Sequence, residues 1–309
     1  MTTNILPFKG PLYRYLSLTK EDKEDLENFS EWSGSNNRIA AQNYIDSNAH
    51  KRDHRLLYLF KNKKLYRTTP SGFNDPYDCL VEIDPIVNDT DLLNWFRMYH
   101  GNQSFDSEEW EKLGRGAEKY LTNNNSIDSE HKQPIIDLLK STLQKLVNRS
   151  RVVCFSENGE NLLMWAHYAD KHSGYCLTFD AKKLKGNNVW VGLYEVDYIE
   201  SRPFIILSPG EIGSNELAKK ILLTKSLHWC YEKEVRLIRN DQKEYFDFQE
   251  SLTGIIFGAK MPPECQKGFQ FLVETLNEST PGNKIEIKCA ELDPRKYEVN
   301  LRDCNLESS

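Results

Sequence analysis

Two carboxylates and a guanidinium recur at alternate positions near residue 234. The segment Trp229–Arg239, WCYEKEVRLIR, is typical of a β-strand, and successive side chains of a strand point to opposite faces. Glu232, Glu234 and Arg236 are therefore expected on one face, together with Cys230. A Glu-x-Glu pair at the floor of a cleft can hold a sugar hydroxyl and stabilise an oxocarbenium-like centre. The pattern also fits a water-exposed face with cross-strand ion pairs, so both interpretations stay open.

An arginine stands among aromatic and aliphatic residues near the start of the chain. The motif LYRY covers Leu12–Tyr15, and burial of the Arg14 cation is costly unless a counter-charge meets it. The planar guanidinium suits a carboxylate or a diphosphate. An ion pair with one of the many acids of the chain fits this motif equally well.

A rigid polar turn is the third candidate. In FNDPYD, residues 73–78, the proline restricts the residue before it, so the loop could position Asn74 or Asp75 over a ligand. The same residues also fit a plain turn closed by Asx hydrogen bonds.

The fourth candidate follows the CFSE motif at 154–157. Trp165, Tyr168 and His172 fall at helical spacing on one face of the predicted helix. Such a stripe fits either core packing or a platform on which a flat ring stacks.

These residues have to be positioned by a chain whose character changes along its length. Before residue 86, short strands are expected at 12–18, 65–69 and 79–83, with a helix at 55–61. From about 86 to 149, apolar residues recur at helical spacing, which predicts a helical insertion. Beyond 150, we expect helices at 161–168 and 263–276 and strands at 151–156, 174–179, 189–199, 229–239, 252–257 and 284–292. Strands grouped without regular βαβ alternation predict an α+β fold, and we expect residues 1–309 to form a single domain.

Composition excludes several classes of protein. The 309 residues are 39% hydrophobic with a net charge of -6, which predicts a folded core and argues against nucleic-acid binding by bulk charge. No apolar run approaches the ~20 residues of a membrane helix, so we expect no membrane partner and a cytoplasmic location. The seven cysteines are scattered and never form Cys-x-x-Cys, which predicts reduced thiols and no metal site.

Taken together, these motifs resemble the bacterial family called domain of unknown function 2971. The family pattern is a Leu-Tyr-Arg-Tyr-like opening, a Phe-Asn-Asp-Pro-Phe-Asp box, a Cys-Phe-Ser strand with a Trp-x-x-Tyr helix, and a Tyr-Glu-x-Glu-x-Arg strand. Here these stand at 12–15, 73–78, 154–168 and 231–236, with Tyr77 in place of the commoner Phe. The family name conveys no activity.

More distantly, the order of elements is similar to that of ADP-ribosyltransferases, especially the DarT group that modifies DNA bases. Those proteins open with a strand bearing His or Arg for NAD, place aromatic residues around the nicotinamide, and finish with a strand bearing the catalytic Glu. Arg14 matches the opening position, where the DarT group has His, and Glu234 in EVRLI matches the catalytic Glu. The resemblance implies an ADP-ribosyltransferase-like split β-sheet core with a helical insertion.

The resemblance also implies an activity. The protein would cleave the nicotinamide glycosidic bond of NAD and transfer ADP-ribose to a nucleic-acid or protein acceptor, in a bacterial toxin or phage-defence system with an antitoxin or other defence partner. Glu234 would hold the ribose 2′-hydroxyl and stabilise the cation, and Glu232 would steer or deprotonate the acceptor. The residues expected to contact NAD are Arg14, Tyr15, Asn74, Asp75, Ser156, Trp165 and Tyr168.

Two hypotheses from other functional classes stay open. In the first, the chain is a non-catalytic ligand-binding or interaction module of a bacterial defence system, and Glu232, Glu234 and Arg236 form an ion-pair lattice. In the second, Asp75, Asp78 and Glu234 hold Mg²⁺ in a nuclease, although no usual nuclease spacing is present.

Overall fold

The computed structural model describes residues 10–84, 86–92, 94, 127, 129–185, 191–205, 215–239, 243–279 and 285–304. The chain divides into two compact units. Unit 1 comprises Met1–Thr68, Arg151–Glu195 and Cys230–Ser309, and unit 2 comprises Thr69–Ser150 and Val196–Trp229. The expectation of a single domain stays a prediction. Much of the helical insertion expected at 86–149 lies outside the described residues, which resume with the helix α6 at Ser129–Val147.

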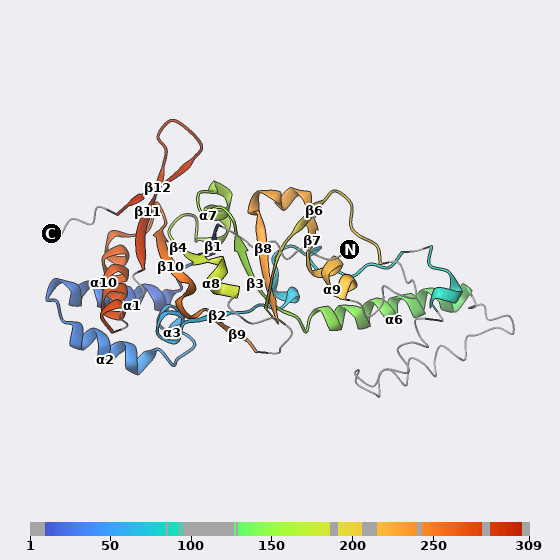
Figure 1. The fold of residues 1–309 in the computed structure, drawn as a ribbon, viewed down its shortest axis with the longest axis horizontal. Coiled ribbons are helices and arrows are strands. Elements are labelled where there is room, and N and C mark those ends of the chain that lie inside the picture. The colour runs from blue at the N-terminus through green and yellow to red at the C-terminus, as the bar shows by residue number, and fades with distance from the viewer. Residues whose placement is uncertain are drawn as a thin grey trace. The chain divides into compact units, whose positions relative to one another are not determined.

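Unit 1 is built on a mixed sheet with the strand order β12-β11-β10-β4-β1-β3-β8-β5 (Figure 1). Neighbouring strands are antiparallel except for β10 and β11, which are parallel. In chain order the strands are β1 Pro11–Leu16, β3 Arg151–Ser156, β4 Tyr175–Asp180, β5 Val191–Glu195, β8 Glu234–Arg239, β10 Leu252–Phe257, β11 Glu286–Leu292 and β12 Val299–Asp303. A large mixed sheet with helices confirms the α+β class.

The two faces of this sheet contribute to two different hydrophobic clusters. The larger one joins inward residues such as Leu12, Leu177 and Val235 to the short helix Ala181–Lys185 and to four longer helices. These are α1 Lys20–Gly34, α2 Arg38–Asn48, α3 Arg55–Asn62 and α10 Pro263–Ser279. The smaller cluster joins Tyr15 to the short helix α7, Leu162–Tyr168. Alternation of side chains along β1 therefore sends Leu12 and Tyr15 to different cores.

Close approach of two helices completes the larger core. At Gly268 of α10, a Cβ would collide with the backbone carbonyl of Leu26 in α1, so only glycine fits there. Helix α1 starts at a capping box in which the Thr19 hydroxyl accepts from the Asp22 amide at 3.0 Å and the Thr19 amide donates to the Asp22 carboxylate at 2.9 Å. No helix was expected from the polar 19–34 stretch, and the Thr-x-x-Asp pattern is the sequence signal that marks its start.

The remaining elements of unit 1 are short. They are β2 Lys64–Tyr66 paired with β9 Tyr245–Asp247, the helix α8 Ala181–Lys185 and the 3₁₀ turn η3 Gln249–Ser251.

A disulfide joins two of the cysteines of unit 1, against the prediction that all seven are reduced. Cys289 in β11 and Cys304, just after β12, have Cα atoms 5.2 Å apart because the two strands form an antiparallel pair. Sequence spacing could not reveal this bond, since it depends on the pairing of two strands whose cysteines are 15 residues apart.

Unit 2 contains the 3₁₀ turn η1 Pro70–Gly72, α6, the parallel pair β6 Asp197–Ile199 and β7 Thr224–Ser226, and α9 Asn215–Leu222. The strand predicted at 79–83 is wrong. Cys79 has a φ of 57°, which no strand adopts, and within 79–83 it is Ile83 that forms a bridge, with Ile205.

Candidate functional site

Three of the motifs found in the sequence lie on neighbouring strands of the unit 1 sheet. LYRY lies on β1, CFSE on β3 and the Glu-x-Arg sequence on β8, and these are three consecutive strands of the sheet. Tyr13 pairs directly with Ser156, and Ser156 pairs directly with Glu234. Segments separated by more than 70 residues in the chain are thereby placed side by side.

The approach to β8 differs from the prediction. Residues Leu227–Glu232 form a 3₁₀ turn, η2, and Lys233 has a φ of 43°, so the strand begins only at Glu234. The alternation expected from residue 229 onwards therefore holds only from Glu234, which shares a face with Arg236. The Glu232 carbonyl accepts a 2.6 Å hydrogen bond from the Ser156 hydroxyl, which fixes the end of η2 against β3.

Glu234 and Arg236 form a buried bidentate pair. The Arg236 Nε donates to Glu234 Oε1 at 2.8 Å, and Nη2 donates to Oε2 at 2.9 Å. Arg236 has an exposed fraction of 0% and Glu234 of 6%, so the water-exposed face that was one interpretation of this segment does not exist. The carboxylate is instead held in one orientation by the fork of the guanidinium.

Helix α7 brings a tyrosine to the second carboxylate. The Tyr168 hydroxyl donates to Glu232 Oε1 at 2.6 Å. Asn161 caps the helix by accepting from the amides of Leu163 and Met164, and its own amide donates to the Tyr231 carbonyl at 2.7 Å. The cap residue thus ties the start of α7 to the η2 turn that carries Glu232.

The aromatic stripe predicted on this helix is only partly formed. Trp165 is fully buried, contacts the Tyr15 ring edge-on at 5.1 Å between centroids and donates Nε1 to the Gly159 carbonyl. These contacts are those of a core residue, whereas Tyr168 is half-buried. His172 does not continue the stripe, because α7 ends at Tyr168 and His172 lies in a turn with a φ of 75°.

Arg14 occupies a split in the sheet. β1 pairs with β4 along its whole length but with β3 at the single position Tyr13–Ser156. The opposite end of β3 is bridged by Thr68 to Val152. Between these points the Arg14 Nη1 donates to the Cys154 carbonyl at 2.7 Å. The guanidinium therefore takes the place of a backbone donor that a fully paired neighbouring strand would supply.

Beside this split lies a cavity of about 600 Å³ within unit 1. Its lining includes Arg14 and the deeply buried Tyr175 from β4. Three further tyrosines line it, and the Tyr245 ring contacts the rings of both Tyr58 and Tyr66. Among the described residues, the Arg14 guanidinium forms no hydrogen bond beyond that to Cys154, and the Tyr175 hydroxyl forms none. Both groups therefore have hydrogen-bonding capacity left for a ligand in the cavity.

Charge around the cavity is mixed but slightly basic. Arg14, Arg52, Arg55 and Lys64 line it, against Glu21, Asp22 and Asp53. Asp22 is already engaged, since its carboxylate accepts from the amides of Thr19 and Leu56. Burial lowers the pKa of Arg14, and the negative charge of Glu234 is among the groups that oppose this lowering. A desolvated guanidinium of this kind gains most from an anionic partner.

The register separates Arg14 from Glu234. Directly paired residues on neighbouring strands share a face, so Tyr13, Ser156 and Glu234 point to one side. Arg14 follows Tyr13 in β1, so its Cβ points to the other side. The Arg14 side chain therefore leaves the sheet on the face of the larger core. The α7 face of the sheet has the other expected site residues of unit 1: Tyr15, Ser156, Trp165, Tyr168, Glu232 and Glu234.

The other two expected contacts, Asn74 and Asp75, belong to unit 2. Asp75 is buried and lines a separate cavity in that unit. Among the described residues there is no group of three His, Cys, Asp or Glu side chains able to hold a metal ion. The same part of the chain has no helix with the length and apolar character needed to cross a bilayer.

Residues 164–237 match a family model described as "Protein of unknown function (DUF2971)". The matched stretch runs from α7 to β8 and includes Trp165, Tyr168, Glu232, Glu234 and Arg236, but neither Arg14 nor the FNDPYD turn. This supports the first resemblance found in the sequence. No curated protein and no solved structure matches the chain. The likeness to the DarT group stays a prediction.

Proposed function

We propose that this protein is an NAD-cleaving enzyme of the ADP-ribosyltransferase type. The observation that carries the proposal is the position of Arg14 in the split between β1 and β3, with spare donors beside a cavity of about 600 Å³. Ser156 lies on the adjacent strand β3, and Glu234 on the strand after that, β8. A cavity of this size suits a nucleotide-sized ligand.

The chemistry of the cavity supports a ligand that carries both phosphate and flat rings. Arg14 offers a fork of N–H donors to a diphosphate, and the Tyr175 hydroxyl adds a further donor. Tyr58 and Tyr245, with ring centroids 4.9 Å apart, offer faces on which a base or nicotinamide ring stacks. Arg52, 5.9 Å above the Tyr245 ring, adds positive charge at the rim.

The reaction would break the bond between nicotinamide and C1′ of the ribose. Nicotinamide leaves with the bonding electrons as a neutral ring, and the ribose becomes an oxocarbenium ion that Glu234 stabilises through the 2′-hydroxyl. The acceptor then forms a bond to C1′ and loses its proton to Glu232. The acceptor class, nucleic acid or protein, and a toxin or phage-defence role in the cytoplasm are part of the same proposal.

The opposite directions of Arg14 and Glu234 constrain where NAD binds. A ligand that touches both side chains has to lie in the split, where β1 and β3 are not paired, because neither face of the sheet presents both. A second candidate function, a binding module without catalysis, is favoured by the Glu234–Arg236 pair, since that carboxylate already has a full counter-charge.

One assay separates the two candidates. Purified protein is incubated with NAD, nicotinamide release is followed by chromatography, and NAD binding is measured by calorimetry. We expect release by the wild type, loss of release but not of binding in Glu234→Gln, and weaker binding in Arg14→Lys. Glu291→Gln on β11, which removes an exposed ion pair with Arg302, is the matched control.

Three outcomes would contradict these assignments. Equal release rates for the wild type and Glu234→Gln remove Glu234 from the reaction. Binding without any release favours the binding module. Absence of NAD binding by the folded wild type ends the proposal.

A further inference from the structure

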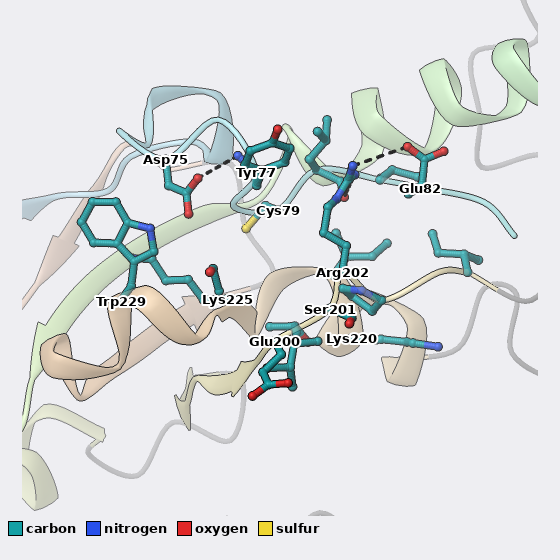
Figure 2. A pocket seen from close by; sticks show the side chains of 18 of the residues that line it. Asp75, Tyr77, Cys79, Glu82, Glu200, Ser201, Arg202, Lys220, Lys225 and Trp229 are labelled. Atoms are coloured by element: carbon teal, nitrogen blue, oxygen red, sulfur yellow. Dashed lines mark hydrogen bonds and ion pairs between the residues drawn. The ribbon is translucent and has the colours of Figure 1, made fainter.

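Unit 2 contains a cavity of its own, of about 540 Å³, that the proposed function does not use. Figure 2 shows the side chains around it. The FNDPYD turn supplies Asp75 and Tyr77 to one wall, and the segment from β7 into η2 supplies Lys225 and Trp229 to another. Two stretches about 150 residues apart in sequence thus enclose one space.

Most of the cavity surface is apolar. Aliphatic residues from the segment after the turn, from the end of β6 and the segment that follows it, and from α9 line the cavity: Leu80, Val81, Ile199, Pro203, Ile205 and Ile221. A surface of this kind favours a ligand with a hydrocarbon or aromatic body.

Lys225, a buried cation of the cavity lining, already has a counter-charge in Asp78, which is buried but does not itself line the cavity. The Lys225 Nζ lies 3.6 Å from Asp78 Oδ2 and 5.1 Å from the centroid of the Trp229 ring. Asp78 Oδ1 also accepts from the Cys79 thiol at 3.2 Å. The positive charge of the Lys225 ammonium is therefore compensated by the Asp78 carboxylate.

The second buried carboxylate has no such partner. Asp75 is 6% exposed, and one of its oxygens accepts from the Tyr77 amide at 2.9 Å. No ion pair to Asp75 is formed by any cation in the described part of the chain. Its other oxygen points toward the side of the cavity where Trp229 and Lys225 lie (Figure 2). A buried carboxylate without a counter-cation is costly, so a cation from outside is favoured here.

The basic residues at the opposite end are directed elsewhere. Arg202 pairs with Glu82 at 3.6 Å and lies 5.4 Å from the centroid of the Tyr77 ring. Lys220 points away from the Asp75 end (Figure 2). Neither residue supplies the counter-charge that Asp75 lacks.

We propose that the unit 2 cavity binds a small organic ammonium ion with an apolar body. The ammonium group donates to the free oxygen of Asp75, and the body fills the space between the aliphatic walls. The FNDPYD turn is then a ligand-positioning element, because the proline fixes the residue before it and that residue is Asp75. The inference is independent of the NAD reaction.

The test uses the full chain and three probes of similar size: phenethylammonium, 2-phenylethanol and 3-phenylpropionate. Calorimetry is expected to show phenethylammonium binding about tenfold or more tightly than the alcohol, since a hydrogen bond to a buried carboxylate is charge-assisted. Asp75→Asn is expected to abolish this preference. Asp84→Asn is the matched control, because Asp84 makes the same turn hydrogen bond, to the Ile86 amide, and does not line the cavity.

A second variant covers the case in which Asp75→Asn does not fold. Leu80 is 41% exposed and lines the cavity, so Leu80→Trp narrows the space without disturbing the core and is expected to weaken binding of phenethylammonium at least as much. The proposal is overturned by equal binding of ammonium and alcohol, by a preference that survives Asp75→Asn, by tight binding to Leu80→Trp, or by no binding to the wild type at about 10 mM phenethylammonium.

Discussion

Removal of Arg236 is expected to destabilise the β3–β8 part of the unit 1 sheet strongly. Its partner Glu234 is buried and both carboxylate oxygens accept from the guanidinium, at 2.8 and 2.9 Å. Arg236→Met keeps an unbranched side chain but removes the guanidinium, so the buried Glu234 carboxylate loses its counter-charge, which costs about 3–5 kcal/mol. That is a large fraction of the roughly 5–15 kcal/mol that stabilises a typical domain.

The compensated variant Glu234→Gln/Arg236→Met isolates the interaction. Neither residue of the pair carries a charge in it, so its loss of stability should be well below that of Arg236→Met alone. The matched control is Arg302→Met, which breaks the exposed pair with Glu291 on β11–β12 and should cost at most about 1 kcal/mol.

Hydrogen–deuterium exchange of peptides from β3 and β8 is the suitable assay, because a chain with two compact units need not unfold in one step. Amides in these strands should exchange about 10²- to 4 × 10³-fold faster in Arg236→Met than in the wild type, which is the stated free energy expressed as a rate ratio. Acceleration of less than about tenfold, or a double variant as unstable as the single one, would refute the buried-pair argument.

Three further outcomes are expected. Tyr168→Phe removes the 2.6 Å hydrogen bond to the buried Glu232 carboxylate. Amide hydrogen exchange in the η2 turn should become faster by a factor that corresponds to about 1–3 kcal/mol, and an unchanged rate contradicts this. Cys304→Ser removes the disulfide bond to Cys289 and should lower the free energy of unfolding by about 3 kcal/mol. The melting temperature should fall accordingly, and dithiothreitol should lower it in the wild type but not in the variant. Burial lowers the pKa of His172, so the unfolded chain binds more protons below about pH 6.5, and stability should fall on acidification through this range; His172→Gln should flatten that profile.

Local patterns predicted some of the individual elements, but the strand expected at 189–199 is two strands, β5 and β6, and neither α1 nor α2 was predicted. Alternating or continuous apolar runs bounded by turn residues gave β3 and β10 their observed bounds, and the helical period gave α3 and α10. Local patterns could not predict the backbone at Cys79 and Lys233, where a positive φ ends a run of residues with strand character. Such conformations are imposed by the packing of distant segments, because neither residue type favours them.

The candidate site depends more heavily on long-range pairing. The sequence shows that Tyr13 and Arg14 point to opposite faces of their strand, and that Glu234 and Arg236 share a face of theirs. It does not show which faces coincide, because this follows from the pairing of Tyr13 with Ser156 and of Ser156 with Glu234. A shift of one residue in either pair would have placed Arg14 and Glu234 on the same side.

Arg14 also explains how a central strand tolerates a cation. β1 is covered by apolar residues on both faces. The Cys154 carbonyl of β3 lacks a backbone donor because β1 and β3 are not paired there, and the Arg14 guanidinium donates to it instead. That role needs a single N–H, and a neutral glutamine could supply it. A guanidinium also has a positive charge, which is costly to bury, and further N–H groups for which no described residue provides a hydrogen-bond acceptor. The Glu234 charge offsets part of this cost, and an anion bound in the adjoining cavity, as the proposed function requires, would offset more. Arg14→Gln should therefore preserve or raise stability without ligand and abolish binding of a diphosphate.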